Sequence, residues 1–325
     1  MTVLVTGGAG YIGSHTVYAL LDRGDQVVVL DDLSTGNRSL VGEKAIFIQG
    51  DVADQPLVVN LIRKHRIDAV IHFAGSIVVP ESVAEPLRYY ENNVVNSRTL
   101  METCVAEGVK NFIFSSTATV YAEDAGQPLR EDSPKAPISP YARSKLMTEW
   151  MLEDASRAHD IRHVVLRYFN VAGADPLGRT GQSTPKATHL IKRACQVALG
   201  REPYLDIFGS DYPTPDGTGV RDYIHVSDLA NAHLLALDAL RDGLTSTSFN
   251  CGYGRGFSVR QVVNAVESVL GRRLPVKVGP SRPGDPPTLI CDPTKLKNTL
   301  GWQPQHQDLE GIIRSALEWE QQLNT

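Results

Sequence analysis

The amino-terminal stretch most constrains the fold, because it reads as a strand, a glycine turn and a helix in immediate succession. Residues 2–6 form an apolar run typical of a buried strand, and Gly7-Gly8-Ala9-Gly10-Tyr11-Ile12-Gly13 follows directly. An amphipathic helix is predicted from there to about Arg23, with Gly24 as its stop. Glycines let a backbone approach a pyrophosphate closely, and a helix amino terminus presents free N–H groups to it. The stretch therefore predicts a dinucleotide-binding turn with cofactor contacts at Gly7, Gly10, Tyr11, Ile12 and Gly13.

The second predicted strand ends in two acids. Residues 26–30 are mostly apolar, and Asp31-Asp32 follows about twenty residues after the glycines, where an acid can bind the adenosine ribose hydroxyls. A carboxylate at this position repels a ribose phosphate. The pattern therefore favours NAD over NADP, although the nearby Arg38 leaves NADP open.

Strands and helices go on alternating along the first half of the chain. Strands are predicted at 45–49, 69–73, 111–114 and 164–170, with a helix at 57–65. Such alternation predicts an α/β fold with a Rossmann-like, doubly wound parallel sheet. Ligands bind beyond the carboxyl ends of the strands in these sheets, and the residues expected to gather there are Asp51, Val52, Phe73, Ala74, Gly75 and Asn92.

A predicted helix starting near Pro140 carries the residues with the clearest chemistry. It places Tyr141 and Lys145 one turn apart on the same face. A phenol titrates near pH ~10, so a tyrosine that accepts a proton near neutrality needs a positive charge beside it. Such pairs also occur on ordinary solvated helix faces, and the surrounding motifs make this one informative.

The second half has shorter mixed elements. Helices are predicted at 190–199, 226–240, 259–270 and 309–323, separated by loops rich in proline and glycine. No flexible linker divides the halves. We therefore expect a dinucleotide-binding domain at 1–170 and a smaller mixed α/β substrate-binding domain at 171–325, with interleaved segments and the substrate between them.

Composition narrows the possible partners and the cell compartment. The 325-residue chain is 42% hydrophobic and 21% charged, and its net charge of −5 comes without acidic or basic runs, which argues against nucleic acid or an anionic membrane as partner. It lacks a signal-like start and an apolar run long enough for a bilayer, which predicts a cytoplasmic location. The spacing of Cys104, Cys195, Cys251 and Cys291 predicts buried free thiols and no metal site.

Taken together, these motifs resemble the extended short-chain dehydrogenase/reductase family, and within it the 4-epimerases of UDP-hexoses. The resemblance covers nearly the whole chain, and its specific segments are residues 6–13, Phe114-Ser115-Ser116-Thr117-Ala118-Thr119-Val120-Tyr121, residues 141–145, Arg167-Tyr168-Phe169-Asn170 and residues 212–226. Each segment is weakly specific alone, but their order and spacing are specific together.

The resemblance implies roles for individual residues. Tyr141 would be the general base, Lys145 would hold the nicotinamide ribose and lower the tyrosine pKa, and Thr117 would bridge the sugar hydroxyl and Tyr141. Further cofactor contacts would come from Ser34, Thr35, Ser115 and Tyr168. The UDP-sugar site would be lined by Asn170, His189, Leu190, Phe208, Arg221, Arg282, Asp285 and Leu289. Thr117 and His189 depart from the usual serine and asparagine of the family.

The implied reaction is reversible NAD-dependent epimerisation at the 4-position of UDP-glucose and UDP-galactose through a transient 4-keto sugar. A 4,6-dehydratase or decarboxylase would start with the same oxidation but needs an acid beside the threonine, where this chain has Ala118 and Thr119. The motifs also fit an epimerase for a UDP-N-acetylhexosamine or UDP-pentose and, less well, a non-catalytic NAD-binding protein. In the family, the residue at the position of Leu289 limits the space around the sugar, so the resemblance implies a preference for UDP-glucose and UDP-galactose with slow conversion of UDP-N-acetylglucosamine. The apolar run Leu289-Ile290-Cys291 leaves open that Leu289 packs in the core instead.

The resemblance also implies a homodimer built on two helices, at about 86–107 and 141–159. Leu146, Trp150 and Leu152 are apolar residues that could form its interface. Helical spacing alone leaves open that they belong to the monomer core instead.

Overall fold

The large sheet has seven strands, all of them parallel to their neighbours, in the order β3-β2-β1-β4-β5-β6-β10. The computed structural model describes residues 1–184, 188–281 and 286–323. This topology confirms the predicted Rossmann-like doubly wound sheet. The strands are β1 (Thr2–Thr6), β2 (Gln26–Asp31), β3 (Ile46–Gln49), β4 (Ile67–His72), β5 (Asn111–Thr117), β6 (Arg162–Tyr168) and β10 (Thr247–Cys251).

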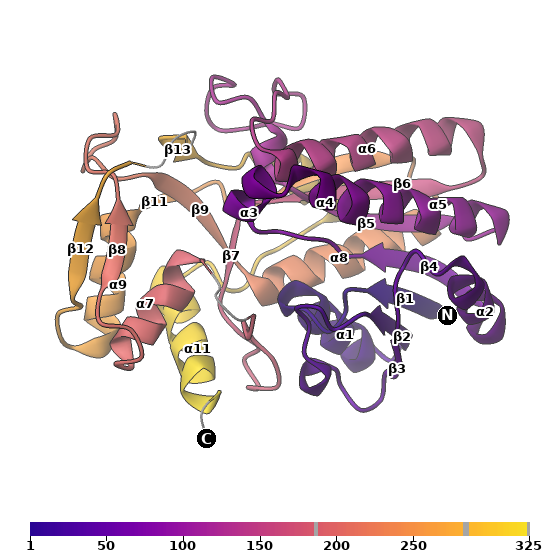
Figure 1. The fold of residues 1–325 in the computed structure, drawn as a ribbon, viewed down its shortest axis with the longest axis horizontal. Coiled ribbons are helices and arrows are strands. Elements are labelled where there is room, and N and C mark those ends of the chain that lie inside the picture. Colours follow the sequence, from indigo (N-terminus) through magenta and orange to yellow (C-terminus); the bar gives the residue numbers. More distant parts are fainter. Residues whose placement is uncertain (185–187, 282–285, 324–325) are drawn as a thin grey trace.

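Helices cover both faces of this sheet, because alternate side chains of each buried strand point to opposite sides. In β1, Val3 and Val5 pack in one core with α1 (Tyr11–Arg23) and α8 (Val226–Arg241). Leu4 packs in a second core under helices on the other face, namely α2 (Gln55–His65), α5 (Asn96–Ala106) and α6 (Pro140–Ala158). Both layers are visible in Figure 1.

Two helix ends follow the local sequence signals. The α1 helix ends at the predicted Gly24, whose φ of 92° is left-handed and suits glycine. The α6 helix starts at Pro140, and the Ser139 side chain caps it by accepting a hydrogen bond from the Ala142 N–H. This cap sets where Tyr141 lies in the first turn.

The helix predicted at 86–107 is interrupted. It consists of α4 (Pro86–Tyr90), a π-helical turn (Glu91–Val95) and α5, and the short α3 (Val79–Ala84) precedes it. A π turn inserts an extra residue and rotates the side chains that follow it. Here the turn contains the buried Asn93, which contacts the candidate site.

The strand predicted at 164–170 is two strands. Strand β6 ends at Tyr168. After the single residue Phe169, β7 (Asn170–Ala172) begins and pairs with β9 of a different sheet. Between them, the Phe169 N–H donates to the Cys251 carbonyl across the sheet. A continuous apolar run does not reveal such a change of partner.

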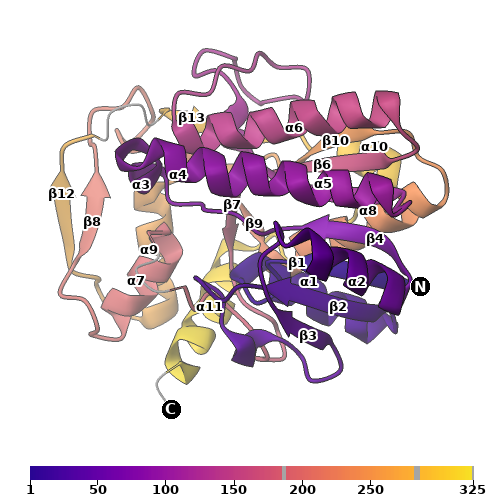
Figure 2. The ribbon, with the colours of Figure 1, turned by 45° about the vertical axis from the view of Figure 1, so that its right-hand side comes forward.

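The smaller lobe lies at one side of the large sheet (Figures 1 and 2). Its helices confirm those predicted, as α7 (Leu190–Ala198), α9 (Val259–Leu270) and α11 (Leu309–Gln322). An additional helix, α10 (Thr294–Leu300), packs against β10 and α8 of the larger lobe. Its strands are β8 (Leu205–Phe208), β9 (Val220–His225), β11 (Gly256–Ser258), β12 (Val276–Gly279) and β13 (Thr288–Leu289). Residues after 170 also supply β10 and α8 to the larger lobe. The domain boundary at residue 170 therefore stays a prediction.

The predicted interface residues on α6 separate into two groups. Leu146 and Leu152 are buried within the monomer, whereas Trp150 is 54% exposed. Leu146 and Leu152 therefore belong to the monomer core, as helical spacing left open.

The predicted free thiols are confirmed, because all four cysteines are unpaired and buried. Within the three described ranges, no helix is long and apolar enough to cross a membrane. The same ranges contain no cluster of three or more His, Cys, Asp or Glu side chains suited to a metal ion.

Candidate functional site

The glycine turn packs so tightly that side chains are excluded. A Cβ at Gly7, where φ is 68°, would lie 2.5 Å from the Ala74 nitrogen, and one at Gly13 would lie 2.2 Å from the Gly7 carbonyl oxygen. The turn therefore sits directly against the end of β4, beside Phe73. Its geometry suits the close approach of a diphosphate to backbone N–H groups at the start of α1.

Asp31 closes the turn as well as ending β2. Its carboxylate is buried and accepts hydrogen bonds from the N–H groups of Ala9 and Leu33, both at 2.9 Å. Burial raises the pKa of Asp31, and these two hydrogen bonds oppose the rise. Two oxygens carry about four acceptor sites, so the carboxylate keeps capacity for ribose hydroxyls.

The other residues predicted around the adenosine are exposed. The Asp32 carboxylate accepts hydrogen bonds from the backbone and hydroxyl of Ser34, and Thr35 is also exposed. The Arg38 guanidinium lies 4.6 Å from the Phe47 ring centroid and donates to the Val41 carbonyl. The described contacts of Arg38 are therefore with Phe47 and Val41, and none of them is with Asp31.

The residues predicted at the strand ends behave differently from one another. Val52 packs in the core, and the exposed Asp51 accepts a hydrogen bond from the Ala53 N–H. A Cβ at Gly75 would lie 2.9 Å from the Asn93 amide oxygen and 3.7 Å from the Lys145 ammonium. Gly75 therefore borders the catalytic candidates, whereas the only described contacts of Asp51 and Val52 are structural.

Asn93 is a site residue that the sequence analysis missed. Its predicted neighbour Asn92 donates only to the Ser76 hydroxyl and to no residue of α6 in the described contacts. The Asn93 amide bonds the backbone of Ser76 on the loop after β4 and the Ser144 hydroxyl on α6. Adjacent asparagines in a helix give no signal for which one turns inward, and the π turn decides it.

Thr117, Tyr141 and Lys145 come together between β5 and α6. The Thr117 hydroxyl lies near the Tyr141 phenol, and the Lys145 ammonium donates to the Ser115 carbonyl at 3.0 Å. Burial raises the pKa of Tyr141 to about 12, and the nearby Thr117 hydroxyl opposes the rise. Burial also lowers the pKa of Lys145 to about 8, and the nearby Glu149 opposes that fall. In the protein alone, burial therefore raises the pKa of the phenol further above neutrality, and the lowering expected from Lys145 stays a prediction.

Tyr168 is oriented by His233 of α8. Its hydroxyl hydrogen-bonds Nε2 of His233, whose Nδ1 lies 2.8 Å from the Leu229 carbonyl oxygen. Because that carbonyl can only accept, Nδ1 carries the proton, and Tyr168 is the donor to Nε2. The nearby Ser115 side chain opposes the rise that burial causes in the pKa of Tyr168. His233, which the sequence analysis did not single out, therefore orients a predicted cofactor contact.

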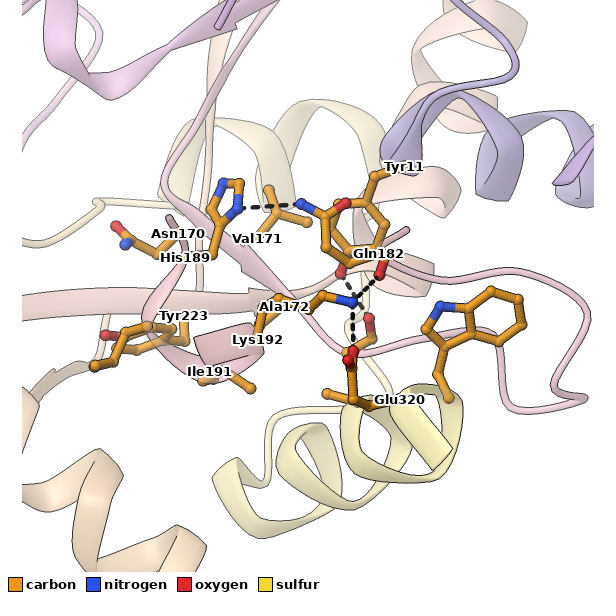
Figure 3. Close-up of a pocket in the computed structure, with 14 residues that line it drawn as sticks. Tyr11, Asn170, Val171, Ala172, Gln182, His189, Ile191, Lys192, Tyr223 and Glu320 are labelled. Carbon is orange, nitrogen blue, oxygen red and sulfur yellow. Dashed lines mark hydrogen bonds and ion pairs between the residues drawn. The ribbon is translucent and has the colours of Figure 1, made fainter. Parts of the chain in front are cut away.

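Three predicted substrate residues line one pocket between the lobes (Figure 3). Asn170 enters it from β7, and His189 and Leu190 enter from the start of α7, opposite Tyr11 of the glycine turn. Tyr11, a predicted cofactor residue, thus shares a pocket with three predicted substrate residues. Residues that were not predicted complete its walls, namely Gln182, Ile191, Lys192, Tyr223, Trp319 and Glu320.

Polar contacts order this pocket. The Gln182 amide nitrogen lies 3.1 Å from Nδ1 of His189, and the Lys192 ammonium donates to the Gln182 carbonyl and to the Glu320 carboxylate. Figure 3 shows the ion pair between Lys192 and Glu320, which joins α7 to α11. Ordinary helix patterning predicted both helices but not the ion pair between them.

The remaining substrate candidates lie on the smaller lobe. Phe208 is exposed at the end of β8, and Arg221 of β9 lies opposite Leu289 of β13 in the strand register. Leu289 is partly buried and packs against the cluster that contains Phe169. Arg282 and Asp285 lie outside the described residues.

Comparison with known proteins agrees with this arrangement. The model of the NAD dependent epimerase/dehydratase family matches residues 3–252. The chain is 58% identical to a UDP-glucose 4-epimerase of Azospirillum brasilense, over 99% of this chain and 92% of the relative.

Solved structures extend the likeness to three dimensions. The Brucella ovis UDP-glucose 4-epimerase in complex with NAD has a TM-score of 0.94 and 44% identity, over 98% of this chain and 97% of that one. The UDP-Glc/GlcNAc 4-epimerase from Campylobacter jejuni has a TM-score of 0.86 and 48% identity, over 99% of each. The resemblance predicted from the motifs is thus confirmed, and the chain belongs to the NAD dependent epimerase/dehydratase family.

Proposed function

We propose that this protein interconverts UDP-glucose and UDP-galactose by NAD-dependent epimerisation at the 4-position of the sugar. The observation that carries the proposal is the meeting of Thr117, Tyr141 and Lys145 at the end of β5, beside the glycine turn. Relatives of similar length that bear the name UDP-glucose 4-epimerase support it.

The residues present fit NAD. The turn at residues 7–13, where Gly7 and Gly13 leave no room for a Cβ, offers N–H groups to the diphosphate, and the Asp31 carboxylate has acceptor sites for the adenosine ribose. Lys145 would bind the nicotinamide ribose. When bound, NAD supplies reversible hydride chemistry and a positively charged ring.

The protein's own residues would handle the proton and the sugar. Tyr141 removes the proton of the sugar 4-hydroxyl while Thr117 holds that hydroxyl by a hydrogen bond. Since burial alone raises the phenol pKa to about 12, the base form requires the added positive charge of the loaded site. The 4-keto sugar then turns over while its UDP stays bound, which presents the opposite face of C4 for reduction, and Tyr141 returns its proton to the 4-oxygen.

The same geometry argues against a dehydratase or decarboxylase. Thr119 accompanies Thr117, with 3.0 Å between the two hydroxyl oxygens, and Ala118 between them is buried. None of these three positions supplies a carboxyl group to drive elimination. Epimerisation needs none.

The direct test is to incubate purified protein with UDP-galactose and resolve the sugar nucleotides by chromatography. We expect UDP-glucose to accumulate until the two sugars reach equilibrium, without net reduction of added NAD. Formation of a 4-keto-6-deoxy sugar or release of CO₂ would favour a dehydratase or a decarboxylase, respectively. Absence of any product despite bound NAD would favour a non-catalytic binding protein.

A second proposal concerns sugar choice. Leu289 is shorter than a tyrosine and only partly buried, next to Arg221 in the register. It should leave some space near the 2-substituent, so UDP-N-acetylglucosamine should react slowly. The 48% identical Campylobacter jejuni protein is named a UDP-Glc/GlcNAc 4-epimerase.

Measuring kcat/KM for both sugar pairs in wild type and Leu289→Tyr tests this proposal. We expect the substitution to depress turnover of the acetylated pair selectively, because the larger ring fills the space near the acetamido group. An equal change for both pairs would show that Leu289 does not control access.

We also propose that the protein forms a homodimer through α4, its π turn and α6, which lie side by side (Figures 1 and 2). Leu87 is 80% exposed there, and Trp150 is 54% exposed. An apolar surface of this kind marks an interaction site. Further exposed apolar residues on the same elements and on α3 are Val83, Val95 and Met147.

A cytoplasmic location remains part of the proposal. Four free thiols suit a compartment that keeps cysteines reduced. Fractionation of cells expressing the native chain would test it.

A further inference from the structure

Glu149 is a buried acid next to the candidate catalytic residues, and the reaction proposed above gives it no role. It is 6% exposed and lies on α6, one turn after Lys145. Its carboxylate accepts a hydrogen bond from the Ser116 hydroxyl. It also accepts hydrogen bonds from Nε and Nη2 of Arg167 on β6, the latter at 2.7 Å.

Three successive residues of β5 therefore face three successive turns of α6. The Thr117 hydroxyl lies near Tyr141, the Ser115 carbonyl accepts a hydrogen bond from Lys145, and the Ser116 hydroxyl donates one to Glu149. The last of these contacts differs from the others, because Glu149 itself has no described contact with the cleft. It instead fixes the end of β5 relative to the helix that carries the reactive pair.

Arg167 extends the contact into a buried network. Its Nη1 donates to the Tyr121 hydroxyl at 2.8 Å, which in turn donates to the Asn250 side chain at 2.6 Å. Asn250 belongs to β10, at the far edge of the sheet. With both side chains almost fully buried, the Arg167 and Glu149 charges balance each other, and either one alone would be an uncompensated buried charge.

The Glu149 charge matters for the Lys145 ammonium because the other groups around it are neutral or positive. His72 on β4 has both ring nitrogens in hydrogen bonds, to Thr6 and Ser97, and burial lowers its pKa to about 3, so it stays neutral. Several titratable or charged groups face Lys145 or lie one contact away from it. They belong to α6, β4 and β6, and they are Tyr141, Glu149, His72, Arg167 and Tyr168. Of these, Glu149 is the group whose negative charge favours the ammonium.

We propose that Glu149 is a positioning residue that keeps Lys145 charged within its apolar surroundings and holds it against the end of β5. This inference rests on the proposed function, in which Lys145 acts as an ammonium. Losing the Glu149 charge should make the ammonium easier to deprotonate, so the alkaline limb of the pH–rate profile should move to lower pH. Losing the Arg167 charge should move that limb in the opposite direction.

The test compares Glu149→Gln with Arg167→Gln, because both break the same buried pair. We expect the alkaline limb of kcat/KM to shift by about one pH unit downward in the first and upward in the second. Ser116→Ala removes a hydrogen bond but no charge, and its limb should coincide with wild type. A merely structural role would instead lower kcat in both charge variants without opposite shifts, which would overturn the proposal.

A second measurement needs no turnover. Titration of ¹³C-labelled lysine side chains by NMR, with Lys145 assigned through Lys145→Met, should show the same ordering of its pKa across the variants. Should a single variant fail to fold, the double variant Glu149→Met/Arg167→Met replaces the pair with apolar side chains of similar size, which is usually tolerated. Its Lys145 signal should still titrate at lower pH than in wild type, since Glu149 is the acid whose charge favours the Lys145 ammonium, and an unchanged titration would refute the proposal.

The two proposals fail in different ways. A wild-type protein that converts no UDP-galactose contradicts the proposed function, whatever the lysine titration shows. A wild type that converts the sugar, with variants whose limbs and Lys145 titrations coincide, contradicts the role of Glu149 alone.

Discussion

Burial acts in opposite directions on two side chains one helical turn apart. It raises the pKa of Tyr141 to about 12 and lowers that of Lys145 to about 8, because in each case it disfavours the charged form. The Lys145 ammonium therefore survives at neutral pH, but the Tyr141 phenolate does not form by itself. In the proposed reaction, the Tyr141 phenolate forms only once a further positive charge enters the site.

Tyr141→Phe tests the residue assigned as base. The substitution removes the hydroxyl without changing the ring that packs beside Thr117, so we expect turnover to fall by ~10²–10⁴ with the fold and NAD affinity intact. Conversion of UDP-galactose and binding of NAD should be measured together. Tyr18→Phe on α1 is a matched control that should leave turnover unchanged, and near-normal turnover of Tyr141→Phe would refute the assignment.

At the scale of elements, the start of α6 decides where the reactive pair lies. The Ser139 hydroxyl oxygen is 3.2 Å from the Ala142 nitrogen that it caps, and Tyr141 belongs to that same first turn. Fraying of this turn would separate the phenol from Thr117 before it affected the rest of the helix.

Ser139→Ala should cost about 1 kcal/mol of stability and also reduce turnover. Asp54→Ala removes the equivalent cap from α2, where the Asp54 side chain accepts from the Leu57 N–H and has no described contact with Thr117, Tyr141 or Lys145. We expect a similar fall in thermal midpoint for both variants but reduced turnover only for Ser139→Ala. Equal turnover in the two would mean that the first turn of α6 tolerates fraying.

At the scale of the whole molecule, buried histidines couple the fold to pH. Burial lowers the pKa to about 4 for His15, His163 and His233, and to about 3 for His72 and His225. The unfolded chain binds more protons than the folded one between these values and the ordinary histidine pKa of ~6.5. Stability is therefore fully present above pH ~6.5 and is lost as the pH falls toward 4 and then 3.

The thermal midpoint measured from pH 7 to pH 4 should fall steadily for this reason. Asp222, whose pKa burial raises to about 6, and Asp31, whose pKa burial also raises, work in the opposite direction but are two groups against these five histidines. His163→Leu removes one of the buried imidazoles and should flatten the pH dependence. An identical slope in wild type and variant would show that histidine protonation does not control acid unfolding.

The proposed homodimer also belongs to this scale. Leu87→Glu with Trp150→Glu places charges on the exposed apolar surface of α4 and α6, so light scattering should report a monomer where wild type gives a dimer. Leu177→Glu, at a residue 73% exposed on another part of the surface, should remain a dimer. A monomeric wild type at micromolar concentration would contradict the proposal.

The sequence by itself determined the features that depend on neighbours along the chain. The glycine turn, the stop of α1 at Gly24, the alternation of strands and helices, and the spacing of Tyr141 and Lys145 all follow from local conformation and hydrophobic period. These local rules suffice for the doubly wound sheet, because successive strand–helix units have few ways to pack.

Only the tertiary structure decided which distant side chains meet. It ended β6 before Phe169, brought β10 back to the large sheet, turned Asn93 rather than Asn92 toward α6, and buried Glu149 against Arg167. The physical reason is that a periodic pattern encodes whether a residue is buried but not its partner. Partners of buried polar groups are set by contacts between segments far apart in sequence, and this site is built mainly from such contacts.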